Sequence, residues 1–288
     1  MPQLPVLALV LAGAIVAIVP VALLAGRRGG RFRALPGWIG AWAQFAVLLV
    51  LLSQATPRVA FPVLGLVMFI ALKQWFFLTP LRAQDRWAMF AAYLAVPLAL
   101  WPAWTGSFDL LSAATGIGLF LLIPILLAIV PRQPGMLDSL GRVLLGVIVY
   151  VFCFAHFGLL THAPPGRLEL FGIVGLAADL PQRLTGRLRP GEERARPVLG
   201  VAVSIVAAAA AGAALGPLAT VSPVHGATAG AITALAIAGG SLVSDAVAQD
   251  LARTASDAMH GRGAFLDRTL PALYAVPVFY HYFQAIGS

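Results

Sequence analysis

The sequence predicts an all-α integral membrane protein of about ten transmembrane helices, with the N-terminus and the C-terminus both outside. Three observations predict it. The chain is 60% hydrophobic and only 10% charged, whereas water-soluble globular domains carry about 25% charged residues. Its mean hydropathy is +0.91. Its apolar residues are grouped into stretches of the length that crosses a hydrocarbon core of about 30 Å, which takes about 20 helical residues.

The apolar stretches form a single multi-span membrane domain, residues 1–288, with no soluble appendage. In chain order they cover residues 4–25, 38–55, 59–78, 87–104, 108–130, 140–161, 168–181, 198–219, 225–247 and 270–286. The seventh stretch, "LELFGIVGLAADLP", has 14 residues and contains Asp179, and the tenth contains Pro277. Both therefore suit a short, tilted or re-entrant helix. In the eighth, the tract "VAAAAAGAALGPLA" supplies small residues that let two helices approach closely.

The basic residues test this count, because Lys and Arg collect in the cytoplasmic loops of membrane proteins. If the N-terminus is outside, the odd-numbered loops hold sixteen of the nineteen basic residues, the outward loops hold Arg58 and Arg167, and Lys73 lies within the third span. We therefore expect both termini outside, in the inner (cytoplasmic) membrane of a bacterium. The sixteen are Arg27, Arg28, Arg31, Arg33, Arg82, Arg86, Arg132, Arg142, Arg183, Arg187, Arg189, Arg194, Arg196, Arg253, Arg262 and Arg268.

The net charge of +8 follows from this topology and requires no nucleic acid partner. The same arginines would also attract anionic membrane phospholipid. The single cysteine, Cys153, lies inside a span, which excludes an intrachain disulfide and a cysteine-based metal site. The chain has no Gly-x-x-x-x-Gly-Lys phosphate loop, no His-Glu-x-x-His motif and no convincing nucleophile elbow.

The remaining polar residues fall mostly into two segments on the predicted cytoplasmic side. One is the loop 182–197 together with Asp179 before it, and the other is the segment 241–283. If residues 241–259 are helical, Asp250, Arg253 and Asp257 share one helical face, because they are spaced at i, i+3 and i+7. Gly261 and Gly263 then permit a sharp reversal of the backbone.

Two interpretations of the second segment stay open at this point. Carboxylates beside a glycine turn at a membrane surface, with arginines nearby, suit a divalent cation and the phosphates that it bridges. Alternatively, the segment is an inner-face loop with salt bridges, in which Asp267 caps the last helix.

The order of these residues resembles the membrane phosphatidate cytidylyltransferases, also called CDP-diacylglycerol synthases. Their signature runs Ser, Lys-Arg, Lys-Asp, Pro-Gly-His-Gly-Gly and Leu-Asp-Arg-x-Asp, and an apolar stretch ending in Ala-Pro-Val-Phe-Tyr follows. Here "GRGAFLDR" and "LYAVPVFYHYF" are similar to its last parts. Aligned without gaps, the matching positions are Ser244, Ser256, Gly261, Gly263, Leu266, Asp267, Arg268, Pro277, Val278, Phe279 and Tyr280.

An upstream segment is also similar to the family. "ADLPQRLTGR" resembles the element Asn/Asp-Asp-x-x-x-Tyr-x-x-Gly-Lys, with Asp179 and Gly186 matching and Arg187 replacing Lys. The departures are equally specific. The Lys-Arg pair falls on Val247 and Ala248, the Lys-Asp pair on Arg253 and Thr254, the His on Arg262, the second Gly of the His-Gly-Gly triplet on Ala264, and the final Asp on Leu270.

The resemblance implies transfer of CMP from CTP to a phosphatidate-like lipid, giving a CDP-lipid and pyrophosphate. It implies catalytic roles for Asp267 and Arg268, and Mg²⁺ held by Asp267, with Asp250 or Asp257 as substitutes for the lost aspartates. Arginine can replace lysine as a phosphate ligand. The residues implied for binding substrate and phosphate are Asp179, Arg187, Ser244, Arg253, Ser256, Gly261, Arg262 and Gly263. By the same resemblance, a homodimer is expected.

Three functional hypotheses follow. The first is a divergent cytidylyltransferase. The second is a catalytically inactive relative that binds an anionic lipid or a nucleotide, or that supports a partner enzyme. The third is a small-solute transporter, because ionisable residues inside a membrane often mark a pathway, and Lys73, His156, Asp179 and Asp245 are the candidates. We expect His156 to be a hydrogen-bonded core residue rather than a proton relay.

Overall fold

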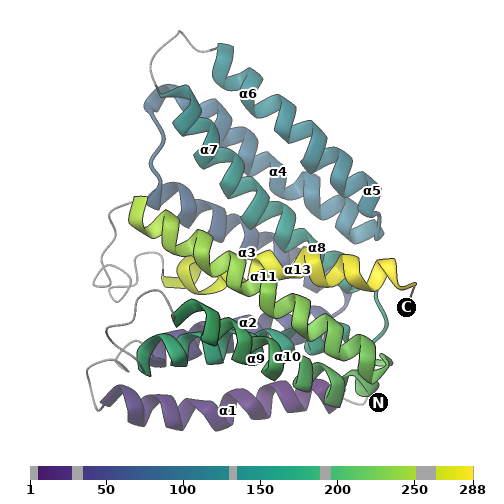
Figure 1. Cartoon of the computed structure of the whole chain (residues 1–288). Helices are drawn as coiled ribbons and strands as arrows, with labels where there is room; N and C mark the ends of the chain where they lie inside the picture. The colour runs from purple at the N-terminus through teal and green to yellow at the C-terminus, as the bar shows by residue number, and fades with distance from the viewer. Residues whose placement is uncertain (1–5, 28–34, 130–134, 189–195, 251–263, 288) are drawn as a thin grey trace. The chain divides into compact units, whose positions relative to one another are not determined.

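The computed structural model describes residues 6–27, 35–129, 135–188, 196–250 and 264–287 (Figure 1). At some helix ends, including residues 186–188 and 264–268, it describes the backbone but not the side chains. Within these ranges all regular structure is helical, and no strand occurs in them. The all-α prediction is confirmed for this part of the chain.

Packing divides the chain into two compact units, a division that hydropathy alone does not reveal. Unit 1 comprises Met1–Gln54 and Ala163–Ser288, and unit 2 comprises Ala55–His162. The two ends of the chain therefore contribute to the same unit.

In its described residues, unit 1 is a bundle of six long helices. In chain order they are α1 (Val6–Arg27), α2 (Leu35–Gln54), α9 (Arg167–Leu188), α10 (Arg196–Leu215), α11 (Pro223–Asp250) and α13 (Ala264–Ala285). Helix α10 packs against α9 and α11, and α13 packs against α11 (Figure 1). Helix α2 contacts α1, α9 and α13, so that the first and last parts of the chain share one core.

Helices α10 and α11 approach each other at backbone contact. A Cβ atom built on Gly212 would lie against the carbonyl group of Gly226, and one built on Gly226 would lie against that of Gly212. One turn further along α11, a Cβ on Gly230 would meet the backbone of Ala208. Small residues permit this short distance between the two helices, because larger side chains would hold the helices apart. The close approach predicted for the tract 206–219 is therefore confirmed.

The described part of unit 2 contains four helical passages, two of them continuous. The continuous ones are α3 (Pro57–Leu78) and α4 (Arg86–Thr105). The third passage joins α5 (Phe108–Leu111), the π-helical segment η3 (Ser112–Leu119) and α6 (Phe120–Ile129), and the fourth joins α7 (Met136–Val147), the π-helical segment η4 (Ile148–Cys153) and α8 (Phe154–Leu160). The Trp75 indole of α3 donates to the carbonyl oxygen of Arg142 at 2.8 Å. This contact requires glycine at position 146, where a Cβ would lie 2.5 Å from the Trp75 ring.

Each of the ten predicted stretches coincides with a helix or a helical passage. Among the described residues, seven helices are long and apolar enough to cross a membrane, which identifies a multi-pass membrane protein. They are Gly37–Gln54, Pro57–Leu78, Arg86–Thr105, Phe108–Ile129, Met136–Leu160, Val198–Ala219 and Pro223–Asp250. A total of ten spans, with both termini outside, stays a prediction.

The seventh predicted stretch is longer than its hydropathy indicates. Residues 168–181 were expected to form a helix of their own, whereas α9 runs from Arg167 to Leu188 and has 22 residues. The first part of the predicted loop 182–197 is therefore helical. The physical reason is that Asp179 and Arg183 are paired within this helix, so that their charges do not end it.

Candidate functional site

The candidate site lies in unit 1, around a buried carboxylate on α9. Asp179 is only 2% exposed. Its Oδ2 accepts hydrogen bonds from the indole Nε1 atoms of Trp38, at 2.6 Å, and Trp42, at 2.8 Å. The two indoles come from α2 and are spaced at i and i+4, so they lie on the same face of that helix. Both are buried, and they hold the carboxylate from one side.

Arg183, one turn further along α9, completes this cluster. Its Nε lies 3.0 Å from both Oδ1 and Oδ2 of Asp179, and its guanidinium carbon lies 5.8 Å from the centroid of the Trp38 ring. A buried carboxylate is costly unless its charge is balanced and its oxygens are hydrogen-bonded. Here three donors meet both requirements. In the structure Asp179 is therefore a hydrogen-bond acceptor that links α2 and α9, and the phosphate-binding role that the resemblance implies stays a prediction.

Helices α11 and α13 form an antiparallel pair beside this cluster. Near the start of α11, His225 Nδ1 lies 2.9 Å from the hydroxyl of Tyr282 in the last turns of α13. Towards its end, a Cβ on Gly240 would lie 2.8 Å from the Cα of Pro271. From this register, Ser244 lies one turn after Gly240, and Asp267 lies one turn before Pro271. The backbones at Ser244 and Asp267 are therefore at the same level of the pair.

The other predicted site residues divide into two groups. Asp250 is the last residue of α11 and is exposed, and Arg187 and Arg268 lie within α9 and α13 at positions where only the backbone is described. Arg253, Ser256, Asp257, Gly261, Arg262 and Gly263 lie outside the described residues. Within the described residues, no group of three or more His, Cys, Asp or Glu side chains is placed to hold a metal ion.

Leu270 is the clearest departure from the family signature that the structure describes. It is 3% exposed and belongs to the apolar core of unit 1. A carboxylate at this position would have to be buried among hydrocarbon without a partner, which is strongly unfavourable. The replacement of the signature Asp by Leu is therefore consistent with the local packing.

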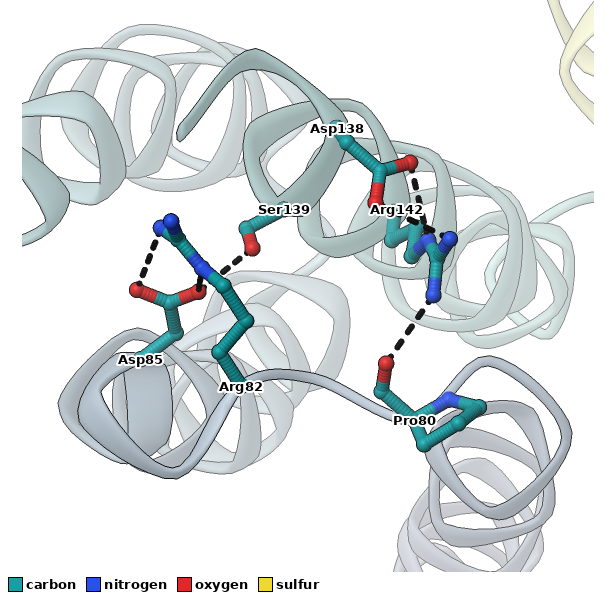
Figure 2. Close-up of polar contacts among 6 residues, drawn as sticks. All are labelled: Pro80, Arg82, Asp85, Asp138, Ser139 and Arg142. Carbon is teal, nitrogen blue, oxygen red and sulfur yellow. Dashed lines mark hydrogen bonds and ion pairs between the residues drawn. The ribbon is translucent and has the colours of Figure 1, made fainter. Parts of the chain in front are cut away.

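Unit 2 contains a second polar cluster (Figure 2). This cluster connects the chain between α3 and α4 with the first turns of α7. Asp85 accepts hydrogen bonds from Arg82 Nε, at 2.6 Å, and from Arg82 Nη2, at 3.0 Å, and its Oδ2 also accepts one from the hydroxyl of Ser139. Arg142 pairs with Asp138 on the same helix and donates to the carbonyl oxygen of Pro80 at 2.9 Å. These contacts join the connection between α3 and α4 to helix α7.

The electrostatics of this second cluster follow from its hydrogen bonds. Burial alone would raise the pKa of Asp85, but the hydrogen bonds from Arg82 and Ser139 and the charge of Arg82 outweigh burial and lower that pKa. The hydrogen bond to Asp85 likewise raises the pKa of Arg82 above its usual value. The cluster is therefore a charged clamp at neutral pH.

We expect the contribution of Asp85 to stability to disappear in acid. Because its pKa is lower in the folded state, ionised Asp85 stabilises the fold above its unfolded pKa of about 3.9, and this stabilisation is lost as the pH falls through that value and then through the folded pKa. Thermal unfolding in detergent should show Asp85→Asn less stable than the wild type at pH 7, with the difference shrinking below about pH 4. Asp109→Asn, at an exposed carboxylate of the same unit, is the control. A difference that stays constant down to pH 3 would contradict the clamp.

The four candidates for a transport pathway lie in different environments. Lys73 and Asp245 are exposed, and Asp179 is paired as described above. His156 is fully buried and its Nδ1 donates to the carbonyl oxygen of Phe152 at 2.8 Å, which confirms the prediction of a hydrogen-bonded core residue.

A pocket of about 240 Å³ in unit 2 is lined almost entirely by apolar side chains of η3, α6, α7 and η4.

Sequence reasoning missed three residues of the unit 1 cluster. Arg183 was counted only as an inner-face charge, and Trp38 and Trp42 were not singled out. The spacing of Asp179 and Arg183 at i and i+4 is a sequence signal for an ion pair on a helix. Nothing in the sequence joins the two tryptophans to Asp179, which is 141 and 137 residues away.

No family model, no curated protein and no solved structure matches this chain. The expectation of a cytidylyltransferase family therefore depends on the signature residues themselves.

Proposed function

We propose that this protein is a divergent phosphatidate cytidylyltransferase-like membrane enzyme, which transfers CMP from CTP to a phosphatidate-like lipid. The observation that carries the proposal is the register of α11 and α13. This register brings the backbones of Ser244 and Asp267, which belong to opposite ends of the resemblance, to one level of an antiparallel helix pair. A signature that is split over two helices can form one site only if such a register exists.

The proposed reaction joins two polyanions. A phosphate oxygen of the lipid attacks the α-phosphorus of CTP, a new P–O bond forms, and the bond from the α-phosphorus to the bridging oxygen of the β-phosphate breaks, releasing pyrophosphate. Cationic groups must offset the negative charge that accumulates at the reacting phosphates. In this proposal Arg268, Arg253 and Arg262 provide side-chain charge, and Ser244 and Ser256 offer hydroxyl groups for hydrogen bonds to phosphate oxygens.

The carboxylates of the segment suit Mg²⁺ by their chemistry, because hard oxygen ligands are those that this ion prefers. Asp267 would hold it together with Asp250, which is exposed at the end of α11, or with Asp257. When bound, Mg²⁺ would supply charge neutralisation at the phosphates. The proposed setting is the inner membrane of a bacterium, with the site on the side that carries most arginines.

The test is transfer of label from radiolabelled CTP into the lipid phase, with purified protein in detergent, phosphatidate and Mg²⁺. We expect lipid-soluble label with the wild type, and a loss of at least about a hundredfold with Asp267→Asn, since removal of one electrostatic stabiliser commonly costs that much. Asp109→Asn, on unit 2, should retain the wild-type rate. Folded wild-type protein that incorporates no label, beside an active synthase assayed in parallel, would overturn the enzymatic proposal for this substrate.

A second function is favoured by one observation, the buried Leu270 in place of a signature aspartate. Loss of a metal-binding carboxylate weakens catalysis more than it weakens binding, because arginines alone can hold phosphates. The second proposal is therefore a catalytically inactive relative that binds an anionic lipid or a nucleotide. Phosphatidate binding without transfer would support it.

A further inference from the structure

The guanidinium of Arg183 is held on one side by the protein and can bind a ligand on the other side. Within the described residues only its Nε is engaged, by Asp179, and neither Nη atom makes a hydrogen bond. The side chain is 26% exposed, whereas that of Asp179 is 3% exposed. The buried side of the guanidinium is therefore fixed, while the other side presents up to four N–H donors.

The residues behind Arg183 restrict its orientation. Two indole N–H groups and the arginine Nε share the oxygens of Asp179, so the carboxylate is held from two helices. The Trp38 ring lies beside the guanidinium carbon. An arginine that is already ordered loses less conformational entropy when it binds a ligand. A guanidinium with free Nη groups binds phosphate oxygens in a bidentate manner.

The position of Arg183 along α9 suits a phosphate at the membrane surface. It lies five residues before Leu188, the last residue of α9, which is about 7–8 Å from the helix end at a rise of 1.5 Å per residue. If α9 ends at the membrane surface, as the predicted topology has it, a long arginine side chain at this distance from the helix end can reach the level of the lipid headgroups. By the predicted topology, this is the side on which most arginines lie.

We propose that Arg183, oriented by Asp179, Trp38 and Trp42, is a phosphate-binding residue of this protein. Its ligand carries a terminal phosphate, either the phosphomonoester headgroup of a lipid or the phosphates of a nucleotide. The proposal deepens the proposed function and rests on it for the identity of these two carriers, but it requires no catalysis. In the element that resembles "Asp-x-x-x-Tyr", Arg183 stands at the tyrosine position, so the interaction would be particular to this chain.

Asp245 provides a test of whether the ligand of Arg183 is an anion. It is exposed on α11 and close enough for its charge to interact with that of Arg183. A negative charge there opposes the binding of an anion to Arg183. Asp245→Asn is therefore expected to strengthen phosphate binding in the presence of EDTA, whereas a purely structural Asp179–Arg183 pair would leave binding unchanged.

The experiment measures binding by calorimetry in detergent with EDTA. The probes are dioctanoyl phosphatidate, CTP, inorganic phosphate and, as the uncharged comparison, dioctanoyl glycerol. We expect Arg183→Gln to weaken the preferred phosphate probe by about tenfold or more, the scale of one charge-assisted hydrogen-bond pair. Arg183→Lys should recover part of the affinity, and Trp38→Phe, which removes one indole donor, should weaken binding severalfold without changing the charge. Preference for phosphatidate would identify the lipid headgroup, and preference for CTP would identify the nucleotide.

Matched variants in unit 2 are Arg58→Gln and Trp101→Phe, both at exposed positions. Both should bind like the wild type. The inference is overturned if folded Arg183→Gln and Trp38→Phe bind every probe as the wild type does, or if no probe binds the wild type. Binding that depends on Arg183 in a protein that transfers no label would overturn the proposed reaction and leave this inference standing. Label transfer by the wild type, together with probe binding that Arg183→Gln leaves unchanged, would do the reverse.

Discussion

Asp179→Leu is expected to destabilise unit 1 by about 3 kcal/mol or more, the cost of breaking a buried ion pair. The substitution removes the acceptor of two indole N–H groups and the counter-charge of Arg183. Buried donors without acceptors cost about 1–3 kcal/mol each, and Arg183 would have to turn towards the membrane surface. The measurement is unfolding by heat, or by a denaturing detergent added to mixed micelles, followed by tryptophan fluorescence.

The double variant Asp179→Leu/Arg183→Leu separates charge from packing. Because it removes both charges, it should be more stable than Asp179→Leu alone, as replacement of a complete ion pair by apolar residues commonly is. Asp138→Leu, which breaks the exposed ion pair with Arg142, is the control and should cost no more than about 1 kcal/mol. If Asp179→Leu is as stable as this control, the cluster does not hold α2 and α9 together.

The helices of this protein were predictable, because their existence depends on local sequence and on the membrane. An apolar stretch of about 20 residues in a bilayer must satisfy its backbone hydrogen bonds internally, and a helix does so. The same reasoning failed at the end of α9. Hydropathy ends this apolar stretch at residue 181, because Asp179 and Arg183 count as polar. In the structure these two side chains form an ion pair within one helix, and the helix continues.

The candidate site was predictable in part for a related reason. Asp179 and Ser244 could be selected from a motif, and their helices from hydropathy. The contacts that give Asp179 its environment could not, since Trp38 and Trp42 lie in a helix separated from it by the whole of unit 2. In unit 2, Arg82 and Asp85 carry a local i, i+3 signal, but the Ser139 hydroxyl reaches Asp85 from 54 residues away. Contacts of this kind depend on helix packing, which periodicity does not specify.

Helix packing in unit 1 should be most sensitive at the glycines that bring α10 and α11 into contact. Gly226→Ala places a Cβ against the carbonyl group of Gly212, and because backbone atoms cannot move aside as a flexible side chain can, the two helices must separate. We expect a loss of about 1–3 kcal/mol or more, the usual cost of overpacking a close contact. Gly239→Ala on the same helix, where a Cβ meets nothing within 4 Å, is the matched control and should be neutral or slightly stabilising, since alanine favours a helix more than glycine does.

The double variant Gly212→Ala/Gly226→Ala distinguishes separation of the helices from two independent clashes. Each methyl group would be accommodated by the same widening of the α10–α11 contact, so the second substitution should cost clearly less than the first, and the two losses should not add. Additive losses would indicate local strain at each glycine with the crossing unchanged. Helix α11 also packs against α13. A wider α10–α11 contact should therefore shift α11 along α13, so that Ser244 and Asp267 no longer lie at the same level. Label transfer and phosphate binding by the Gly226→Ala protein, compared with those of Gly239→Ala, would then show whether the site depends on this packing.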